Sequence, residues 1–336
     1  MIYNIIIILF FSITIIFFSK KYNYLINSTG NVHQKYTTSE SVPILGGVII
    51  FLSLLLKFEY SNLAIYLFIF LIFLLGIFSD LNKISSPISR FLIQIILIIF
   101  FINFIKIEIF PIRVSIIDIL LNNFHLNVLF TSFCILIIIN GTNFIDGMNN
   151  LALGYFLIVS FVLKNMNYNG YDLLLFLDLN YLIYVLCILY ILNFFNKIYL
   201  GDNGAYLIGL IFSIFLIDFY NDNYTKVSPF FIVLLLWYPA FENLFSILRK
   251  INFRSSPIKP DTLHLHQLVF KFLKDKLKKD DKIINTFTGN LINVFNLLMI
   301  LFGLQKVHSS SFQIILILLS IIFYVFIYIR LLKYKN

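Results

Sequence analysis

The sequence contains few charged residues. Only 12% of its 336 residues are Asp, Glu, Lys or Arg, whereas 60% are hydrophobic, and the mean hydropathy is +0.93. This balance excludes a soluble globular protein. The apolar residues form repeated segments of roughly 15–23 residues, mostly long enough to cross a hydrocarbon core about 30 Å thick as helices. The sequence therefore predicts an all-α, polytopic integral membrane protein with about 10–11 transmembrane helices, in which residues 1–336 form a single membrane-embedded domain.

Cysteine and conventional leader features are scarce as well. The two cysteines, Cys134 and Cys187, lie within apolar segments and predict buried, inert thiols rather than a disulfide or a metal site. The apolar stretch from Met1 to Phe18 has no preceding basic region and no small-residue cleavage site. It therefore predicts a retained first span rather than a cleaved signal peptide.

The positions of the basic residues predict an orientation. Eleven spans are expected, at roughly 2–18, 44–58, 63–79, 91–110, 127–140, 150–164, 174–195, 204–218, 228–247, 288–304 and 310–330. Nineteen of the 25 Lys and Arg residues then lie on one side of the membrane, which should be the cytoplasmic side. The N-terminus is expected outside and the C-terminus inside, with cytoplasmic loops at about 19–43, 80–90, 141–149, 196–203 and 248–287. The net charge of +9 is thereby explained without a nucleic-acid partner.

One cytoplasmic segment differs from the spans. Residues 264–282 place apolar side chains at helical spacing and lysines on the remaining faces. This pattern predicts an amphipathic helix at the membrane interface, where the lysines meet anionic lipid headgroups.

Four short polar stretches interrupt the apolar sequence, all on the expected cytoplasmic side. Placing a carboxylate near the membrane costs free energy, so a stretch that contains one is a candidate functional site. The first contains Ser79, Asp80, Lys83 and Arg90. A carboxylate beside two cations could position a phosphate-bearing lipid and activate its oxygen. The alternative is a solvated loop whose lysine extends to the interface.

The second stretch, residues 140–147, contains Asn140, Asn143 and Asp146. The asparagines offer donors and acceptors suited to a nucleobase, a ribose or a phosphate. A helix cap is the alternative, although a cap needs only one of these residues.

The third stretch, residues 201–204, places Asp202 in a glycine-rich turn before an apolar segment. An aspartate there can bind a hard cation such as Mg²⁺, and Asp202 is the candidate metal ligand. The alternative is again a helix N-cap.

The fourth stretch combines Asp261, His264 and His266 with nearby basic residues. Two histidines at this spacing without a cysteine make a zinc site a poor match, and contacts to phosphate are favoured.

Taken together, the stretches resemble the bacterial polyprenyl-phosphate N-acetylhexosamine-1-phosphate transferases (glycosyltransferase family 4), whose superfamily includes the muramoyl-pentapeptide enzyme. The matching segments follow the family's order between about residues 43 and 267: 43–47, 76–94, 140–152, 201–209 and 260–266. Two positions depart from the family pattern. Ser79 replaces the first of two adjacent aspartates, and Gln267 replaces the second of two adjacent histidines.

The resemblance implies transfer of a sugar 1-phosphate from a UDP-N-acetylhexosamine, by default UDP-GlcNAc, to undecaprenyl phosphate with release of UMP. It implies Mg²⁺ or Mn²⁺ as cofactor, a bacterial inner-membrane location and a homodimer. The implied catalytic residues are Asp80, Asp146 and Asp202, with Asp202 binding the metal. The implied substrate-binding residues are Lys83, Arg90, Asn140, Asn143, Asp261, His264 and His266.

Two other functional classes compete with this interpretation. A transporter would place polar residues near the bilayer midplane, often on inverted repeats, whereas here they gather on one side. A membrane scaffold of polysaccharide synthesis that has lost activity is compatible with Ser79, although Asp80, Asp146 and Asp202 are retained.

Overall fold

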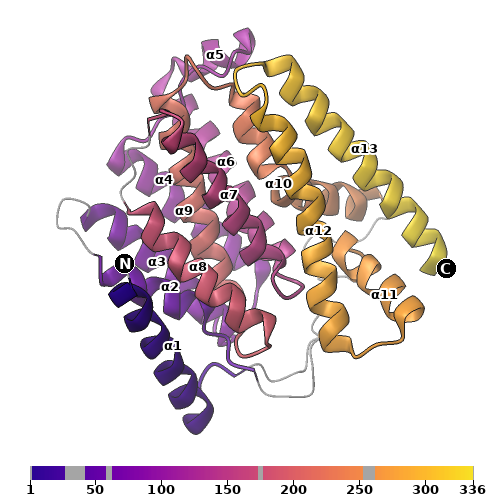
Figure 1. The fold of residues 1–336 in the computed structure, drawn as a ribbon. Helices are drawn as coiled ribbons and strands as arrows, with labels where there is room; N and C mark the ends of the chain where they lie inside the picture. The colour runs from indigo at the N-terminus through magenta and orange to yellow at the C-terminus, as the bar shows by residue number, and fades with distance from the viewer. Residues whose placement is uncertain (1, 27–41, 58–62, 173–176, 253–261, 336) are drawn as a thin grey trace.

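The protein is a bundle of α-helices in the computed structural model, which describes residues 2–26, 42–57, 63–172, 177–252 and 262–335 (Figure 1). These residues form no strand, only isolated bridges that pair Ile26 with Pro43 and Ile44 with Tyr199. The helices within the described ranges are α1 (Ile2–Tyr22), α2 (Gly46–Leu55), α3 (Leu63–Asp80), α4 (Pro87–Ile105), α5 (Ser115–Leu121), α6 (Phe124–Ile145), α7 (Leu151–Tyr168), α8 (Leu179–Phe194), α9 (Gly201–Asp222), α10 (Pro229–Asn252), α11 (Leu265–Leu277), α12 (Asp281–Leu304) and α13 (Ser310–Lys335). The all-α prediction is confirmed.

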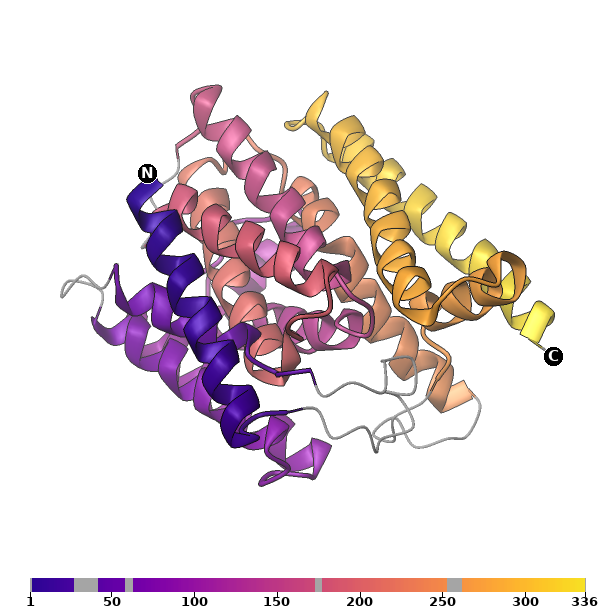
Figure 2. The ribbon, with the colours of Figure 1, turned by 60° about the horizontal axis from the view of Figure 1, so that its bottom comes forward.

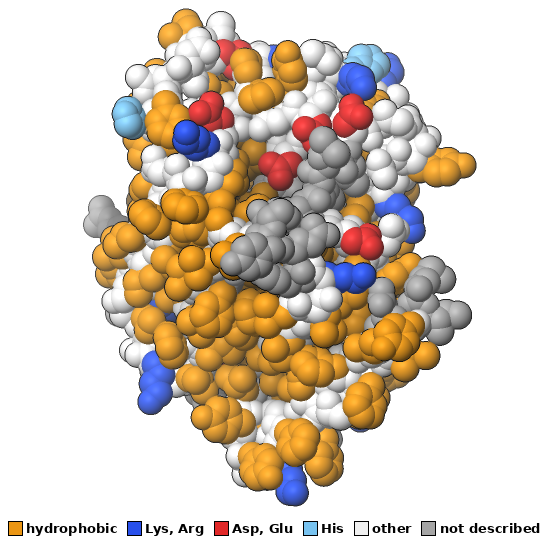
Figure 3. All heavy atoms as spheres, turned by 90° about the vertical axis from the view of Figure 1, so that its left-hand side faces the viewer, with side chains coloured by type: hydrophobic (Ala, Val, Ile, Leu, Met, Phe, Trp, Pro, Cys, Tyr) orange, Lys and Arg blue, Asp and Glu red, His pale blue; other side chains and the backbone are white. Residues whose placement is uncertain are grey.

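The predicted spans all correspond to helices, but not all of these helices have full length. Nine described helices are long and apolar enough to cross a membrane, whereas α2 and α8 are shorter apolar helices. At 1.5 Å per residue, the 10 residues of α2 extend over only about 15 Å. The apolar side chains exposed on the outer helices cover much of the face in Figure 3, as a lipid-facing surface requires.

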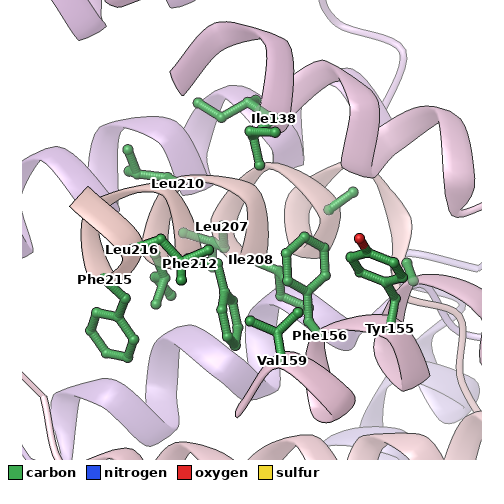
Figure 4. Close-up of a cluster of buried hydrophobic side chains, with 14 of the residues drawn as sticks. Ile138, Tyr155, Phe156, Val159, Leu207, Ile208, Leu210, Phe212, Phe215 and Leu216 are labelled. Atoms are coloured by element: carbon green, nitrogen blue, oxygen red, sulfur yellow. The ribbon is translucent and has the colours of Figure 1, made fainter. Parts of the chain in front are cut away.

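Helix α9 is the centre of the bundle. Its small residues Gly204 and Gly209 let the backbones of neighbouring helices approach closely. Nearly every residue from Asn203 to Tyr220 is buried, mainly against α6, α3 and α2. Figure 4 shows part of this core, in which Phe156 of α7 packs on Phe212 of α9 with ring centroids 4.8 Å apart.

Helix α10 contains a proline in its interior. Pro239 has no N–H, so the carbonyl of Leu235 one turn earlier loses its helical hydrogen bond. The hydroxyl of Tyr155 on α7 donates to that carbonyl at 2.9 Å. A neighbouring helix therefore satisfies the group that the proline leaves unpaired.

Helices α11, α12 and α13 lie together along one side of the molecule, opposite α1 (Figures 1 and 2). The predicted amphipathic helix within residues 264–282 is present as α11, which buries Leu265, Leu268 and Phe270. The sequence did not predict the short helix α5.

Two helices extend further than the sequence predicts, so several polar residues lie on helices and not in loops. Helix α6 continues to Ile145, so Asn140 and Asn143 lie on its last turns rather than in a loop. Helix α9 begins at Gly201, so Asp202 lies in its first turn. The segment before α9 runs beside the start of α2, where Gly46 donates its N–H to the carbonyl of Tyr199 at 3.1 Å. These contacts fix where α9 begins.

The close approach of α3 to α9 requires Gly76. A Cβ atom at this position would lie 2.4 Å from the Cα of Asn203, which is backbone and cannot rotate away. We expect Gly76→Ala to lower the free energy of unfolding by about 1–3 kcal/mol, the usual cost of overpacking. Thermal denaturation in detergent, followed by circular dichroism, measures this change.

Leu67→Ala on the same helix is the control, because Leu67 is 53% exposed on the outer surface. It should leave the transition nearly unchanged. Equal effects of the two variants would show that the contact with Asn203 does not limit the packing.

Candidate active site

The first turn of α9 is bound by a carboxylate from another helix. Asp80, the last residue of α3, accepts hydrogen bonds from the backbone N–H of Asp202 at 3.0 Å and of Asn203 at 2.9 Å. The side-chain amide of Asn203 also donates to it. A helix N-terminus presents unpaired N–H groups and a partial positive charge, and Asp80 satisfies both. Asp80 therefore has a structural role in addition to any chemical one.

Asp202 is the centre of a second set of contacts. Its Oδ2 atom accepts from Arg90 at 2.7 Å and from the Ser79 hydroxyl, and its Oδ1 atom accepts from Asn143 at 2.5 Å. Arg90 also donates to the Ser79 hydroxyl. Ser79 thus joins Arg90 to Asp202. Three of the predicted polar stretches meet at this one carboxylate.

Asp146 completes a group of three carboxylates. It follows α6 as the C-cap and accepts from the backbone N–H of Gly201 at 3.2 Å. Burial raises the pKa of Asp146 well above its ordinary value, and the charges of Asp202 and Asp80 raise it further, against the effect of the Gly201 hydrogen bond. Burial is the main cause of this shift, and the close approach of the three carboxylates adds to it.

The grouping of these carboxylates suits a cation. Three carboxylates lie around one helix terminus, and Arg90 is paired with only one of them. Among the described residues, no three His, Cys, Asp or Glu side chains are grouped so as to hold a metal ion by themselves. Mg²⁺ does not need such a group, because it usually binds one or two carboxylates together with substrate phosphates and water. The donor set therefore fits Mg²⁺.

The two histidines lie beside this group. His264 and His266 stack with ring centroids 5.5 Å apart, and Phe144 of α6 packs on His264 at 5.4 Å. A Cβ atom at Gly147 would lie 2.2 Å from the Nε2 atom of His266. Only glycine at this position lets the imidazole approach the backbone directly after Asp146. The fourth polar stretch thus meets the second.

The structure gives other contacts or positions for the remaining residues that the sequence singled out. Asn140 donates from its amide to Gln94 at 2.9 Å and to the carbonyl of Leu136, so it links α6 to α4. Lys83 is exposed in the turn between α3 and α4. Asp261 lies outside the described residues. Gln267 accepts from the backbone N–H of His264 at 3.2 Å, so it helps to cap α11.

Sequence reasoning did not identify Glu242. This residue of α10 is 1% exposed, and its carboxylate contacts His264 and Tyr324. The signal was present in the sequence, because Glu242 is an acidic residue inside the predicted span 228–247, where an ionisable side chain is expensive.

Parts of the chain are similar to known proteins. Residues 62–220 match the family described as Glycosyl transferase family 4. The undecaprenyl-phosphate alpha-N-acetylglucosaminyl 1-phosphate transferase of Thermotoga maritima is 27% identical over 228 residues, which cover 68% of each chain. The probable undecaprenyl-phosphate N-acetylglucosaminyl 1-phosphate transferase of Bacillus subtilis is 26% identical over 73% of this chain and 69% of its own. The decaprenyl-phosphate N-acetylglucosaminephosphotransferase of Mycolicibacterium smegmatis is 30% identical over 38% of this chain and 37% of its own.

The hydrogen bonds of Asp80 predict its contribution to stability. We expect Asp80→Ala to lower the free energy of unfolding by about 1–2 kcal/mol, because the first turn of α9 loses its acceptor inside the bundle. Thermal denaturation in detergent measures the loss.

Asp178→Ala provides a matched control. Asp178 caps α8 by accepting from the N–H of Asn180, but it does so at the exposed end of that helix. Its replacement should cost less than that of Asp80, because water can satisfy the freed N–H. A smaller loss for Asp80→Ala than for Asp178→Ala would contradict the structural role of Asp80.

Proposed function

We propose that the chain, whose residues 62–220 match glycosyl transferase family 4, transfers a sugar 1-phosphate to a polyprenyl phosphate. The donor is a UDP-N-acetylhexosamine, with UDP-GlcNAc as the default, and the acceptor is undecaprenyl phosphate. The products are UMP and a lipid-linked sugar pyrophosphate that starts a surface glycan. The relatives from Thermotoga maritima and Bacillus subtilis carry names for this type of transfer, with N-acetylglucosamine as the sugar.

The observation that carries the proposal is the convergence of Asp80, Asp146 and Asp202 on the first turn of α9. In the reaction, an anionic phosphate oxygen of the lipid attacks an anionic diphosphate. The two reactants repel each other unless cations offset their charge. A cluster of carboxylates that attracts a divalent cation, next to arginine and histidines, meets this need.

Asp202 is the proposed ligand of Mg²⁺, and the charges of Asp80 and Asp146 add to the attraction. When bound, the ion would neutralise charge on the diphosphate of the donor and polarise its phosphorus–oxygen bonds. Arg90 holds Asp202 in place from α4, and Asn143 does so from α6. The donor diphosphate is thereby directed to the N-terminus of α9.

The other residues divide between the two substrates. Asp80 positions or deprotonates the lipid phosphate while it holds α9, and Asn143 and Asp146 contact the nucleotide side. Lys83, His264 and His266 offset phosphate charge. The basic residues predict an orientation with the N-terminus outside and the C-terminus inside. In this orientation the site lies on the cytoplasmic side, where UDP-sugars are found.

A catalytically inactive scaffold is the competing function, and Ser79 is the residue that favours it. In this structure the Ser79 hydroxyl bridges Arg90 and Asp202, so the position keeps a polar contact within the site although it lacks a carboxylate. A site that retains three carboxylates and their partners favours the enzyme.

The direct test is release of UMP by the purified protein in detergent, with undecaprenyl phosphate, Mg²⁺ and a panel of UDP-N-acetylhexosamines. We expect release that depends on both the lipid and Mg²⁺, with one preferred donor. No release with any donor, from protein with an intact thermal transition, would overturn the proposal and favour the scaffold. Ser79→Asp would then be the first change to try.

The role of Asp202 has its own test. We expect Asp202→Asn to abolish Mg²⁺-dependent UMP release, because an amide oxygen carries no charge and binds the cation weakly. Asp218→Asn is the matched control, since Asp218 is a partly buried aspartate near the opposite end of the same helix. It should retain activity. Normal activity of Asp202→Asn would remove this residue from the metal role.

A further inference from the structure

Glu242 is a buried acid that the proposed chemistry does not use. It lies within the membrane-spanning part of α10 and is 1% exposed. Removing a carboxylate from water costs several kcal/mol unless partners compensate for the lost hydration. The contacts of Glu242 therefore indicate its role.

Both oxygens of Glu242 have a partner. The Oε1 atom lies 2.9 Å from Nδ1 of His264, and the Oε2 atom accepts from the hydroxyl of Tyr324 on α13 at 2.7 Å. Aromatic rings of Phe241 and Phe245 pack edge-on against Tyr324, at centroid distances of 4.9 and 5.3 Å. Tyr324 is therefore held firmly, and it restricts Glu242 in turn.

The contact determines how His264 is presented. An ionised carboxylate only accepts hydrogen bonds, so the Nδ1 atom of His264 carries the proton that is shared with Glu242. The orientation and the tautomer of the ring are then set together, as they are where a carboxylate orients a metal-bound histidine. His264 in turn stacks on His266, whose ring lies against Gly147 beside Asp146.

We propose that Glu242 is a positioning residue, which with Tyr324 fixes the imidazole of His264 so that it meets the diphosphate of the donor. The inference rests on the proposed function, because it assigns His264 to that substrate. It links α10 and α13 to a site whose carboxylates come from α3, α6 and α9. Helix α13 thus takes part in catalysis through one hydroxyl group, without touching substrate.

The kinetic test compares Glu242→Ala, Glu242→Gln and Tyr324→Phe. We expect Glu242→Ala to lower kcat about 10–100-fold with little change in the KM of the lipid acceptor, as for other residues that orient a histidine. Glu242→Gln should lower kcat less, because its amide oxygen still accepts from Nδ1. Tyr324→Phe should lower kcat less, roughly 3–10-fold, because it loosens the carboxylate but leaves its contact with His264.

A double-mutant cycle separates positioning from general loss of stability. In a His264→Ala background, Glu242→Ala should reduce kcat no further, since the group that it orients is gone. Tyr181→Phe is the control for stability, because it removes a buried tyrosine hydroxyl that joins α8 to the carbonyl of Ser53 on α2 and is bonded neither to Glu242 nor to a histidine. It should leave kcat unchanged. Losses that multiply in the double mutant, or an unchanged kcat in Glu242→Ala, would overturn the inference.

A spectroscopic readout separates this inference from the proposed function. The chain has five histidines, so the NMR signals of a ¹⁵N-histidine-labelled sample are few. The signals of the His264 ring nitrogens can be assigned because they disappear in His264→Ala. We expect the Nδ1 resonance to shift in Glu242→Ala and to stay in place in Tyr181→Phe. If the wild-type protein releases no UMP, the proposed function fails, and this resonance alone decides whether Glu242 positions His264. An unshifted resonance in Glu242→Ala would overturn the inference.

Discussion

The first turn of α9 is the constraint on which the site depends. Its N–H groups lack partners within their own helix, and they lie inside a bundle where water is scarce. Asp80 satisfies two of them, and Asp146 accepts the N–H of Gly201. The carboxylates gather there because the helix terminus needs acceptors and its partial charge favours anions. Their mutual repulsion then makes the same place attractive to a cation, so one backbone feature accounts for both the assembly of the site and its chemistry.

The sequence was sufficient to predict the class of fold and the meeting of the polar stretches. Charged residues are so costly in apolar segments that their positions alone marked Asp80, Asp146 and Asp202. The positive charge of the loops then placed them on one side. Polar stretches that lie on one side can meet there, and the hydrogen bonds of Asp202 to Arg90 and Asn143 confirm that they do. The amphipathic helix was predicted equally well, because its periodicity is local.

The partners of each side chain could not be predicted, because they depend on helix packing between distant segments. Asp80 looked free to act on a substrate, whereas its oxygens accept from the N-terminus of α9. Asn140 looked like a ligand-binding residue, yet its amide contacts Gln94 on a helix 46 positions earlier. Glu242 was missed because a single acid in a long apolar run has no neighbouring motif. Its partners, His264 and Tyr324, lie 22 and 82 residues away in the chain.

The burial of α9 also separates the site from the bilayer. A membrane that is thinner or thicker than a span makes lipid-facing helices tilt or bend, at a modest cost per ångström of mismatch. Helix α9 presents almost no surface to lipid, and α2, α3 and α6 stand between it and the acyl chains. Changes in lipid composition therefore act on the outer helices first. The carboxylates at the start of α9 are fixed to the innermost helix, so their spacing is insulated from the thickness of the membrane in which the protein works.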